Sequence, residues 1–530
     1  MKQTCNPLHP SNNENYFIVH CSLFIVLCVT LLVAGCTENE LPSIANGKTG
    51  ELSWELLENG TLIISGKGVM PDYHYDPLLW TITSPWVEHR NDITSLIIGD
   101  KITNIGDWAF GGCDRLTSVV IGSSVTVLGS MSFGNCSALT DISIPNSVTS
   151  IRDNAFRGCT SLVSVTLSNS VSFIGDYAFG GCTGLTSVTI PNSVIAIGSS
   201  VFTHCTGLTS IHVDNSNTAY SSEDGVLFNK TKTTLVQYPA GKEGAYVIPD
   251  IVTSIGSRAF EECPELTSVT IPGSVTGIDA YAFSGCTGLT ALTIPNSITS
   301  INEGAFCTSG LTSIIIPNSI ISLSDNLFYD CRGLLSVIIP NSVISIGGRA
   351  FQGCSSLISV TIPGSVTEIG AYAFISCTDL TSVTIPNSVV SIGEGAFLGC
   401  RSLLAVTIPN TLTSIESGTF YGCESLTSVI IPNPITTIGA QAFKDCTGLK
   451  SLTIGSSVTN IVYEAFRDCT GLTEIINLRE IPQTIINYNF NVFNGVDKIT
   501  CTLFVPAGSE TAYRTAEVWK DFENIKVIIL

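Results

Sequence analysis

The sequence has few charged residues and few of the residue types that build catalytic or metal sites. Of 530 residues, 12% are charged, and only six are histidine. It contains no HExxH pair, no CxxC pair and no complete phosphate-binding motif of the form GxxxxGK followed by Ser or Thr. These patterns position metal ligands, a general base or a phosphate. We therefore expect no enzyme activity, no metal site and no cofactor.

Basic clusters are also missing. The net charge is -20, from 43 acidic and 23 basic residues. An acidic chain without a Lys/Arg patch repels the phosphate backbone, so we expect no nucleic-acid partner.

Only one long hydrophobic run occurs, and it lies at the N-terminus, where "YFIVHCSLFIVLCVTLLVAGC" ends at Cys36. Its core, Leu23 to Val33, has the length of the apolar region of a signal peptide. The ending "LVAGC" resembles a lipobox, in which Cys36 becomes the lipidated first residue. The following "TENE" resembles the surface-export signal of Bacteroides-type lipoproteins. The alternative is an uncleaved anchor helix. The lipobox and the anchor helix both predict a chain that is exported and tethered to the membrane. We assign 1–36 to the signal segment and 37–49 to a flexible linker.

The rest of the chain is dominated by a repeat whose anchor is a Phe followed three residues later by a Cys. The anchors are Phe110, Phe133, Phe156, Phe179, Phe202, Phe260, Phe283, Phe328, Phe351, Phe374, Phe397, Phe420, Phe443 and Phe466, most of them 23 residues apart. Phe306 belongs to a coil that is one residue short. The step from Phe202 to Phe260 contains a 35-residue insertion. A unit this small cannot bury its own apolar face, so the copies must stack around a shared core.

One copy, "LTSVTIPNSVVSIGEGAFLGC", predicts the fold of a coil. "LTSVTIP" has the β-branched residues of a strand and is closed by a proline, "PNS" is a turn, and a short turn or 3₁₀ segment follows Gly393. Eight apolar positions should form the core: Leu380, Val383, Ile385, Val389, Ile392, Ala396, Phe397 and Cys400. We predict an α/β-type repeat solenoid of about 16 coils, dominated by a parallel sheet, with short turns or 3₁₀ segments on the other side and a cap at each end.

The repeated sequence motif resembles the BspA-type leucine-rich repeat of bacterial surface proteins over residues 93–476. The flanks, 50–92 and 477–530, resemble the N-terminal and C-terminal caps of that family. Tyr513, Trp519 and Phe522 are expected to cover the last coil from one helix face. Within 212–250, "GVLF" and "TLVQY" predict a β-hairpin that protrudes from one edge of the solenoid.

Fifteen cysteines recur in register at an inward position. Many cysteines in an exported protein favour disulfides. However, side chains stacked in register run parallel, whereas a disulfide needs a twist near 90°. We therefore predict a ladder of free thiols.

Candidate contact residues lie between the inward positions of the strands, on a face that we expect to be concave. They are Ser187, Thr189, His212, Ile315, Ile338, Ser359, Thr361, Ser382 and Thr384. The hydroxyls serve either a ligand or strand formation and solubility. The isoleucines form an exposed apolar pair, which favours a contact. Four aromatic residues of the N-terminal cap either bind a ligand or fill the cap core: Tyr73, Tyr75, Trp80 and Trp86.

The resemblance implies a monomeric outer-membrane lipoprotein at the cell surface that mediates adhesion to host matrix, host cells or other bacteria. Its partner would be a protein or glycan, and its only membrane contact a lipid anchor. Two alternatives stay open: capture of glycans or nutrients at the outer membrane, and a structural role in the cell envelope.

Overall fold

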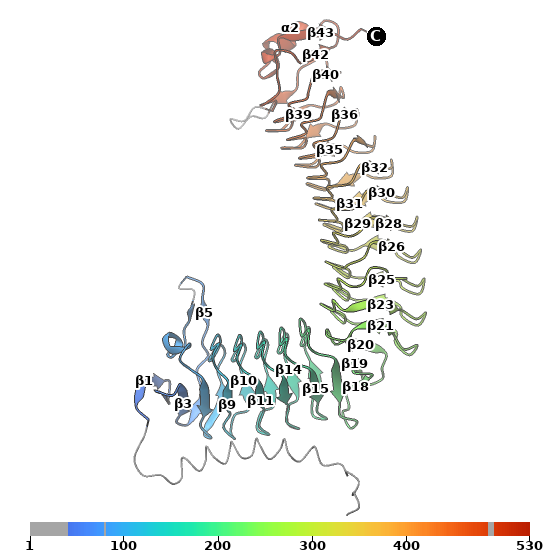
Figure 1. Ribbon diagram of the computed structural model, residues 1–530. Coiled ribbons are helices and arrows are strands. Elements are labelled where there is room, and N and C mark those ends of the chain that lie inside the picture. The colour runs from blue at the N-terminus through green and yellow to red at the C-terminus, as the bar shows by residue number, and fades with distance from the viewer. Residues whose placement is uncertain (1–40, 79–80, 486–491, 530) are drawn as a thin grey trace, which may run out of the picture.

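The computed structural model describes residues 41–78, 81–485 and 492–529, which form a parallel β-solenoid of about 19 turns with almost no helix. Figure 1 shows two arms that meet at a bend near β15 to β20. The described residues hold a single α-helix, α2 (Glu510–Thr515), so the expected α/β type is wrong. The number of turns exceeds the expected 16 coils because further parallel strands continue the stack on both sides of the coils that carry the Phe and Cys anchors.

The predicted core positions are confirmed. In the coil that starts at Leu380, all eight apolar side chains are at most 7% exposed. Ser382 and Thr384, which alternate with Val383 in the same strand, face solvent. A short coil therefore buries one side of its strand and leaves the other side free.

The first strand of each coil contributes to what we call the principal sheet. Its strands are β7 (Ser95–Ile98), β9 (Ser118–Val120), β11 (Asp141–Ser143), β13 (Ser164–Thr166), β15 (Ser187–Ile190), β17 (Ser210–Val213), β21 (Gly244–Val247), β23 (Leu266–Thr270), β26 (Ser313–Ile315), β28 (Ser336–Ile338), β30 (Ser359–Thr361), β32 (Ser382–Thr384), β34 (Ala405–Thr407), β36 (Ser428–Ile431), β38 (Ser451–Ile454), β40 (Glu474–Asn477), β42 (Thr502–Val505) and β43 (Asn524–Val527). Within each hydrogen-bonded group the strands pair in parallel; for example, Ser359 lies opposite Ser382, whereas β21 and β23 pair with a register shift between Gly244 and Ala245.

The segment after the "PNS" turn forms a second ladder of mostly two-residue strands, which the sequence did not predict. Its members are β4 (Gly68–Val69), β8 (Ile102–Ile105), β10 (Val127–Leu128), β12 (Ser150–Ile151), β14 (Phe173–Ile174), β16 (Ala196–Ile197), β20 (Thr234–Gln237), β22 (Ser254–Ile255), β24 (Gly277–Ile278), β25 (Ser300–Ile301), β27 (Ser322–Leu323), β29 (Ser345–Ile346), β31 (Glu368–Ile369), β33 (Ser391–Ile392), β35 (Ser414–Ile415), β37 (Thr437–Ile438), β39 (Asn460–Ile461) and β41 (Thr484–Ile485).

The third side of each coil is a run of turns that hydrogen-bonds to the next coil. The N–H groups of Tyr372, Phe374 and Ser376 donate to carbonyls of the following coil at 2.7–2.8 Å. Tyr372 and Ser376 adopt left-handed φ values of 58° and 59°. The expected 3₁₀ segments are not found in the described coils: η1 (Val87–His89) and η2 (Trp519–Asp521) lie outside them.

The anchor phenylalanines stack on one another along the core. The rings of Phe374 and Phe397 are parallel within 1°, with centroids 5.3 Å apart. Offset aromatic pairs at such distances add stability beyond burial of their area. One row of ring contacts runs from Trp86 to Phe202, and a second runs from Tyr238 to Trp519.

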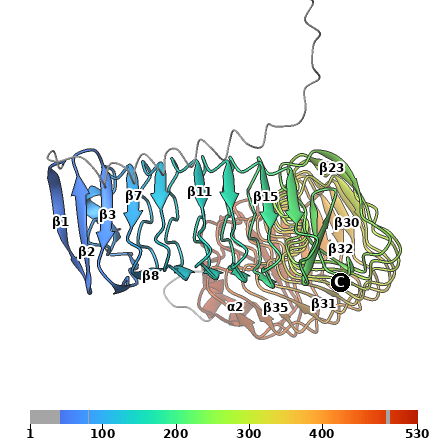
Figure 2. The ribbon, with the colours of Figure 1, turned by 90° about the horizontal axis from the view of Figure 1, so that it is seen from below.

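The principal sheet lies on the outer side of the bent molecule, so the expected concave face is wrong. In Figure 1, β28, β30 and β32 lie outward of β29 and β31 in the C-terminal arm. Figure 2 shows the outer face of the N-terminal arm, where β7, β11 and β15 are seen. Hydrogen bonding between neighbouring strands is interrupted more often in the principal sheet, whose strands form seven separate hydrogen-bonded groups, than in the second ladder, whose strands form four. Hydrogen bonding between coils is therefore less continuous on the principal side, and this is the side that lies outward.

The insertion is built into the stack and does not protrude. Three antiparallel strands, β18 (Tyr220–Glu223), β19 (Val226–Asn229) and β20, form a meander, and β20 then pairs in parallel with β22. Val226, Leu227 and Phe228 are fully buried. We call this region the joint, because the hydrophobic core is divided here into one cluster for each arm.

Both ends differ from expectation. The segment 43–49, expected to be linker, forms β1 (Ser43–Thr49), which pairs with β2 (Leu52–Leu57) and through it with β3 (Thr61–Ser65). A small hairpin of β5 (Tyr75–Asp76) and β6 (Thr81–Ile82) follows. At the other end, Tyr513, Trp519 and Phe522 are buried, but they come from α2, η2 and the residue after η2. They therefore do not share one helix face.

Candidate functional site

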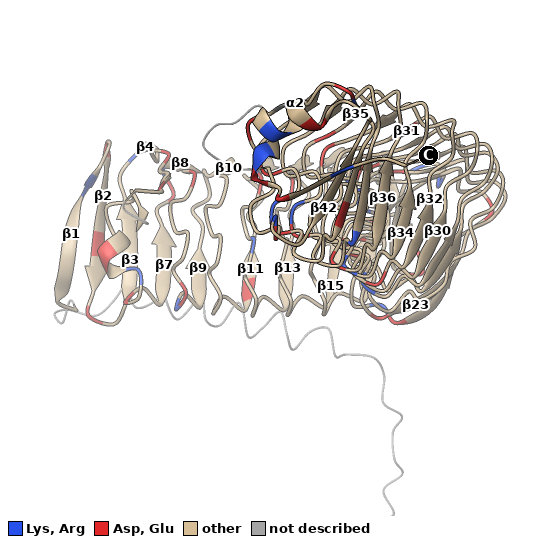
Figure 3. Cartoon of the chain, turned by 90° about the horizontal axis from the view of Figure 1, so that it is seen from above, with Lys and Arg blue, Asp and Glu red and all other residues tan. Residues whose placement is uncertain are grey.

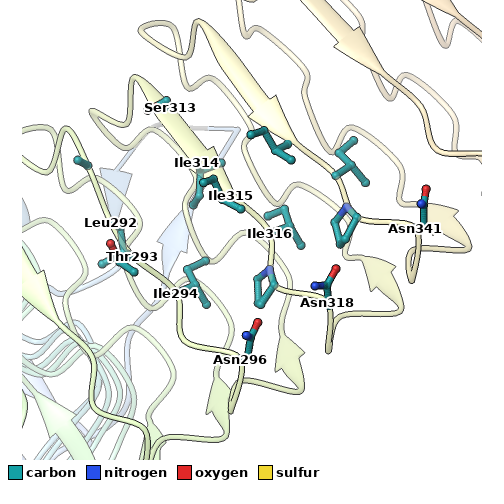
Figure 4. Close-up of a pocket in the computed structure, with 15 residues that line it drawn as sticks. Leu292, Thr293, Ile294, Asn296, Ser313, Ile314, Ile315, Ile316, Asn318 and Asn341 are labelled. Atoms are coloured by element: carbon teal, nitrogen blue, oxygen red, sulfur yellow. The ribbon is translucent and has the colours of Figure 1, made fainter.

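A groove of about 670 Å³ opens on the principal sheet of the C-terminal arm. Its walls come from residues 291–296, from β26 and from β28 (Figure 4). It lies beside the coil that contains Phe306 and is one residue short. The strand segment of that coil is reduced to a single bridge between Ala291 and Ser313. The groove therefore lies where the principal ladder is interrupted, next to the short coil.

The groove is uncharged, and its lining mixes apolar side chains with neutral polar ones. Ile315 and Ile338 lie opposite each other in paired strands and are 63% and 58% exposed. Three exposed asparagines, Asn296, Asn318 and Asn341, line its edge, one from each coil. Charged residues are absent from the groove lining, and Figure 3 shows that charged residues of the chain lie mainly in turns.

The structure brings six of the predicted contact residues into one arm. Ile315 and Ile338 line the groove, and Ser359, Thr361, Ser382 and Thr384 follow on the next coils. The other three, Ser187, Thr189 and His212, lie on β15 and β17 before the joint. The nine candidates thus form two separate surfaces.

The hydroxyls of the repeat fall into two classes. Threonines at the corners of the coils bond to the preceding coil: Thr381 donates to the Ile358 carbonyl at 3.1 Å and Thr367 to the Ile344 carbonyl at 3.2 Å. Ser382 and Thr384 are exposed and make no side-chain hydrogen bond to the described residues. Corner hydroxyls therefore hold coils together, whereas the strand hydroxyls of Ser382 and Thr384 are free to meet a ligand.

The cap aromatics mostly fill the cap core. Trp86 is fully buried, and its indole N–H donates to the Ala109 carbonyl at 2.7 Å. Tyr73 is 8% exposed and contacts Trp86 edge to face. Tyr75 is 39% exposed and stacks on Trp108. Trp80 lies outside the described residues.

The predicted lipidation site, Cys36, also lies outside the described residues. Within the part of the chain that the structure describes, no helix has the length and apolar character needed to cross a bilayer.

The repeat cysteines are packed in the core. All sixteen cysteines of the described residues are free, and each is buried except the partly exposed Cys307. The Cys400 thiol donates to the Phe374 carbonyl of the preceding coil at 3.2 Å, and the same contact recurs along the stack. Burial raises the pKa of the Cys400 thiol to about 12. Such thiols act as small apolar residues.

Sequence analysis missed the asparagine edge of the groove and Thr293 beside it. The signal was present: the coil at Phe306 is one residue short, and it directly precedes the coil that carries Ile315. The effect of the missing residue on the neighbouring surface depends on how the coils pack against each other, and the sequence does not give this packing.

A family model described as "BspA type Leucine rich repeat region (6 copies)" matches residues 82–209, 132–242, 253–380 and 367–500. Among solved structures, the chain is similar to a leucine-rich repeat protein from Bacteroides ovatus, with 25% identity, 93% of this chain and 100% of that chain covered, and a TM-score of 0.40. A leucine-rich repeat protein from Eubacterium ventriosum has 23% identity, coverages of 86% and 95%, and a TM-score of 0.41. A leucine rich cell surface protein from Faecalibacterium prausnitzii has 23% identity, coverages of 87% and 99%, and a TM-score of 0.29. No curated protein matches the chain.

Proposed function

The chain belongs to the BspA-type leucine-rich repeat family, and from this premise we propose that it is a protein-binding scaffold whose contact site is the groove beside Ile315 and Ile338. The observation that carries the proposal is the pair of exposed isoleucines at an uncharged groove of about 670 Å³. Exposed apolar clusters in a solvated protein mark contact surfaces.

The groove favours an extended partner segment with an uncharged, aliphatic or aromatic side chain. Such a side chain would enter between β26 and β28, while Asn318 and Asn341 hydrogen-bond to the partner's main chain. Covering the exposed parts of the two isoleucines would contribute roughly 1–2 kcal/mol each. The unbonded hydroxyls of Ser359, Thr361, Ser382 and Thr384 extend the same face along the arm.

The sequence supports a location for this scaffold. The lipobox-like ending at Cys36 and the acidic residues after it support a lipoprotein at the outer surface of the cell. At that location the partner would be a protein of the host matrix, of a host cell or of another bacterium. The protein would then act as an adhesin, binding through one rigid face.

The test compares three forms of the protein on a panel of immobilised matrix proteins (fibronectin, fibrinogen, laminin and collagen) and on whole bacterial cells. The double variant Ile315→Asp/Ile338→Asp should weaken binding about 30-fold or more, since each tenfold corresponds to about 1.4 kcal/mol. The control is Ile430→Asp, because Ile430 is also a strand isoleucine, 68% exposed, but does not line the groove. The control should bind as the natural protein does. Equal effects of both changes, or no binding to any member of the panel, would contradict the proposal.

A further inference from the structure

The joint leaves backbone donors without acceptors on the turn side of the solenoid. In the coil before it, the N–H groups of Tyr177, Phe179 and Gly181 donate to carbonyls of the next coil at 2.8–3.0 Å. The equivalent N–H groups one coil later belong to Ser200 and Phe202, which are buried, and to His204, which is exposed. They have no hydrogen-bond partner among the described residues, because the insertion replaces the next coil. Buried backbone N–H groups without a partner are rare.

A cavity of about 280 Å³ lies at this place, between Gly198–Phe202 on one side and β20 with Gly256 and Ser257 on the other. The second ladder is interrupted here, because β16 pairs with β14 but not with β20. The N–H of Ile197 donates instead to the hydroxyl of Tyr220 at 2.9 Å. Ile197 is partly exposed, whereas Ile174, at the same position of the preceding coil, is fully buried. The cavity therefore has an apolar wall that the regular coils cover.

Two polar side chains complete the lining. Gln237 is 5% exposed, and the contact that its amide makes is a 3.3 Å hydrogen bond to the Tyr238 carbonyl. Asp176 accepts the N–H of Ser199 through one carboxylate oxygen at 2.7 Å, and its second oxygen makes no hydrogen bond to the described residues. The cavity thus presents main-chain donors, a carboxamide and a carboxylate acceptor beside apolar surface.

This combination selects against ions. Cationic side chains are absent from the lining, and Asp176 repels an anion. Two further carboxylates lie close to the donors: Glu261 accepts from the Ser200 hydroxyl at 3.0 Å, and Glu262 lies 3.6 Å from His204. A cation is also disfavoured, because only the carboxylate of Asp176 lines the cavity and the unpaired N–H groups opposite it carry partial positive charge. A neutral ligand rich in hydroxyls can both accept from the N–H groups and donate to Asp176, with its C–H face on the partly exposed Ile197.

We propose that the joint cavity binds a single neutral sugar ring. Its volume is below the roughly 300–1,000 Å³ of pockets that hold drug-sized ligands, so one ring fits better than an oligosaccharide. The ring comes either free in solution or as the terminal unit of a glycan. This site is separate from the groove beside Ile315, and either site can fail without the other.

The experiment measures saturation-transfer NMR of the folded protein with glucose, galactose, mannose and N-acetylglucosamine, and with mucin as a glycan-bearing protein. At least one free sugar should bind with a Kd of about 1–10 mM. Binding of mucin together with that sugar identifies a terminal sugar as the source, and binding of the free sugar alone identifies a soluble one. Binding of a neutral tetrapeptide without binding of any sugar would overturn the proposal, as would the absence of binding altogether.

Matched variants locate the site. Asp176→Asn should weaken sugar binding about 3- to 10-fold, because the amide oxygen still accepts a neutral hydrogen bond and only the extra strength of the charged acceptor is lost. The control is Asp153→Asn, because Asp153 accepts the N–H of Asp176 at 2.9 Å in the same way, one coil earlier, and does not line the cavity. Ser257→Trp, at an exposed rim position, should fill the cavity and abolish binding while circular dichroism stays unchanged. If both aspartate variants lose binding equally, or if Ser257→Trp binds normally, the site is not the joint cavity.

Discussion

At the scale of single residues, the cysteine at the end of each repeat stabilises the stack in two ways. It fills the core as a small apolar side chain, and its thiol donates to the carbonyl of a phenylalanine one coil earlier, as Cys136 does to Phe110 at 3.2 Å. Burial raises the pKa of the Cys136 thiol well above its usual value. Because the thiolate is the reactive form, these cysteines should be chemically inert in the folded protein.

Alkylation should therefore separate Cys307 from the other fifteen cysteines of the described residues. Cys307 is partly exposed, since it follows Phe306 directly in the short coil. Iodoacetamide added to the folded protein should label Cys307 first, and labelling of the buried cysteines should require denaturant. Peptide mass spectrometry after timed quenching measures this order. Rapid labelling of Cys400 in the folded protein would contradict it.

A second prediction at this scale concerns Glu464 and acid. The pKa of Glu464 is lowered from 4.5 to about 2, chiefly by the hydrogen bond from Lys444 at 2.8 Å and further by Gln441 and Arg467. A carboxyl with a lowered folded-state pKa stabilises the fold above its unfolded-state pKa and loses this effect as pH falls through the folded-state value. The contribution of Glu464 should therefore be complete above pH 4.5 and disappear toward pH 2.

Thermal unfolding of Glu464→Gln as a function of pH tests this. The variant should have a lower Tm than the natural protein at neutral pH, and the two Tm values should converge as the pH approaches 2. Glu368→Gln serves as the control, because Glu368 is exposed on β31 and makes no ion pair in the described structure. A Tm difference that does not change with pH would show that the pKa of Glu464 is not lowered.

At the scale of elements, β19 is a strand with two buried faces. Leu227 packs into the core of the N-terminal arm, and its neighbours Val226 and Phe228 pack into the core of the C-terminal arm. Most strands of the principal sheet bury one face and expose the other. β19 therefore acts as a wall between the two cores, and this is the physical basis of the bend at the joint.

Adjacent substitutions in β19 should destabilise opposite arms. Leu227→Ala should lower hydrogen-exchange protection mainly in residues 43–213, and Phe228→Ala mainly in residues 244–300. Each should cost about 3–5 kcal/mol locally, because each leaves a cavity in a packed core. Hydrogen-exchange mass spectrometry of the two variants measures the difference. Equal loss of protection in both arms for both variants would show that the joint does not separate the cores.

At the scale of the whole molecule, the bend decides which surfaces face outward. The principal sheet lies on the outer side of both arms, so its hydroxyls and the groove beside Ile315 face away from the inside of the bend (Figure 1). A large partner could reach this face without entering the space between the arms. Nearest-neighbour stacking also means that a local irregularity, such as the short coil, changes the surface near it and leaves distant coils intact.

The sequence by itself determined the coil. The 23-residue period placed Leu380, Val383 and Phe397 in the core and Ser382 and Thr384 outside it, because stacking leaves each position with the same neighbour in every coil. It also marked the irregular coil at Phe306 and the pair Ile315 and Ile338. Only the tertiary structure decided how the coils accumulate. The second ladder, the outward placement of the principal sheet, the groove and the cavity at the joint depend on how a missing or inserted residue is absorbed by neighbouring coils. That is a property of packing between repeats, and the pattern within one repeat does not contain it.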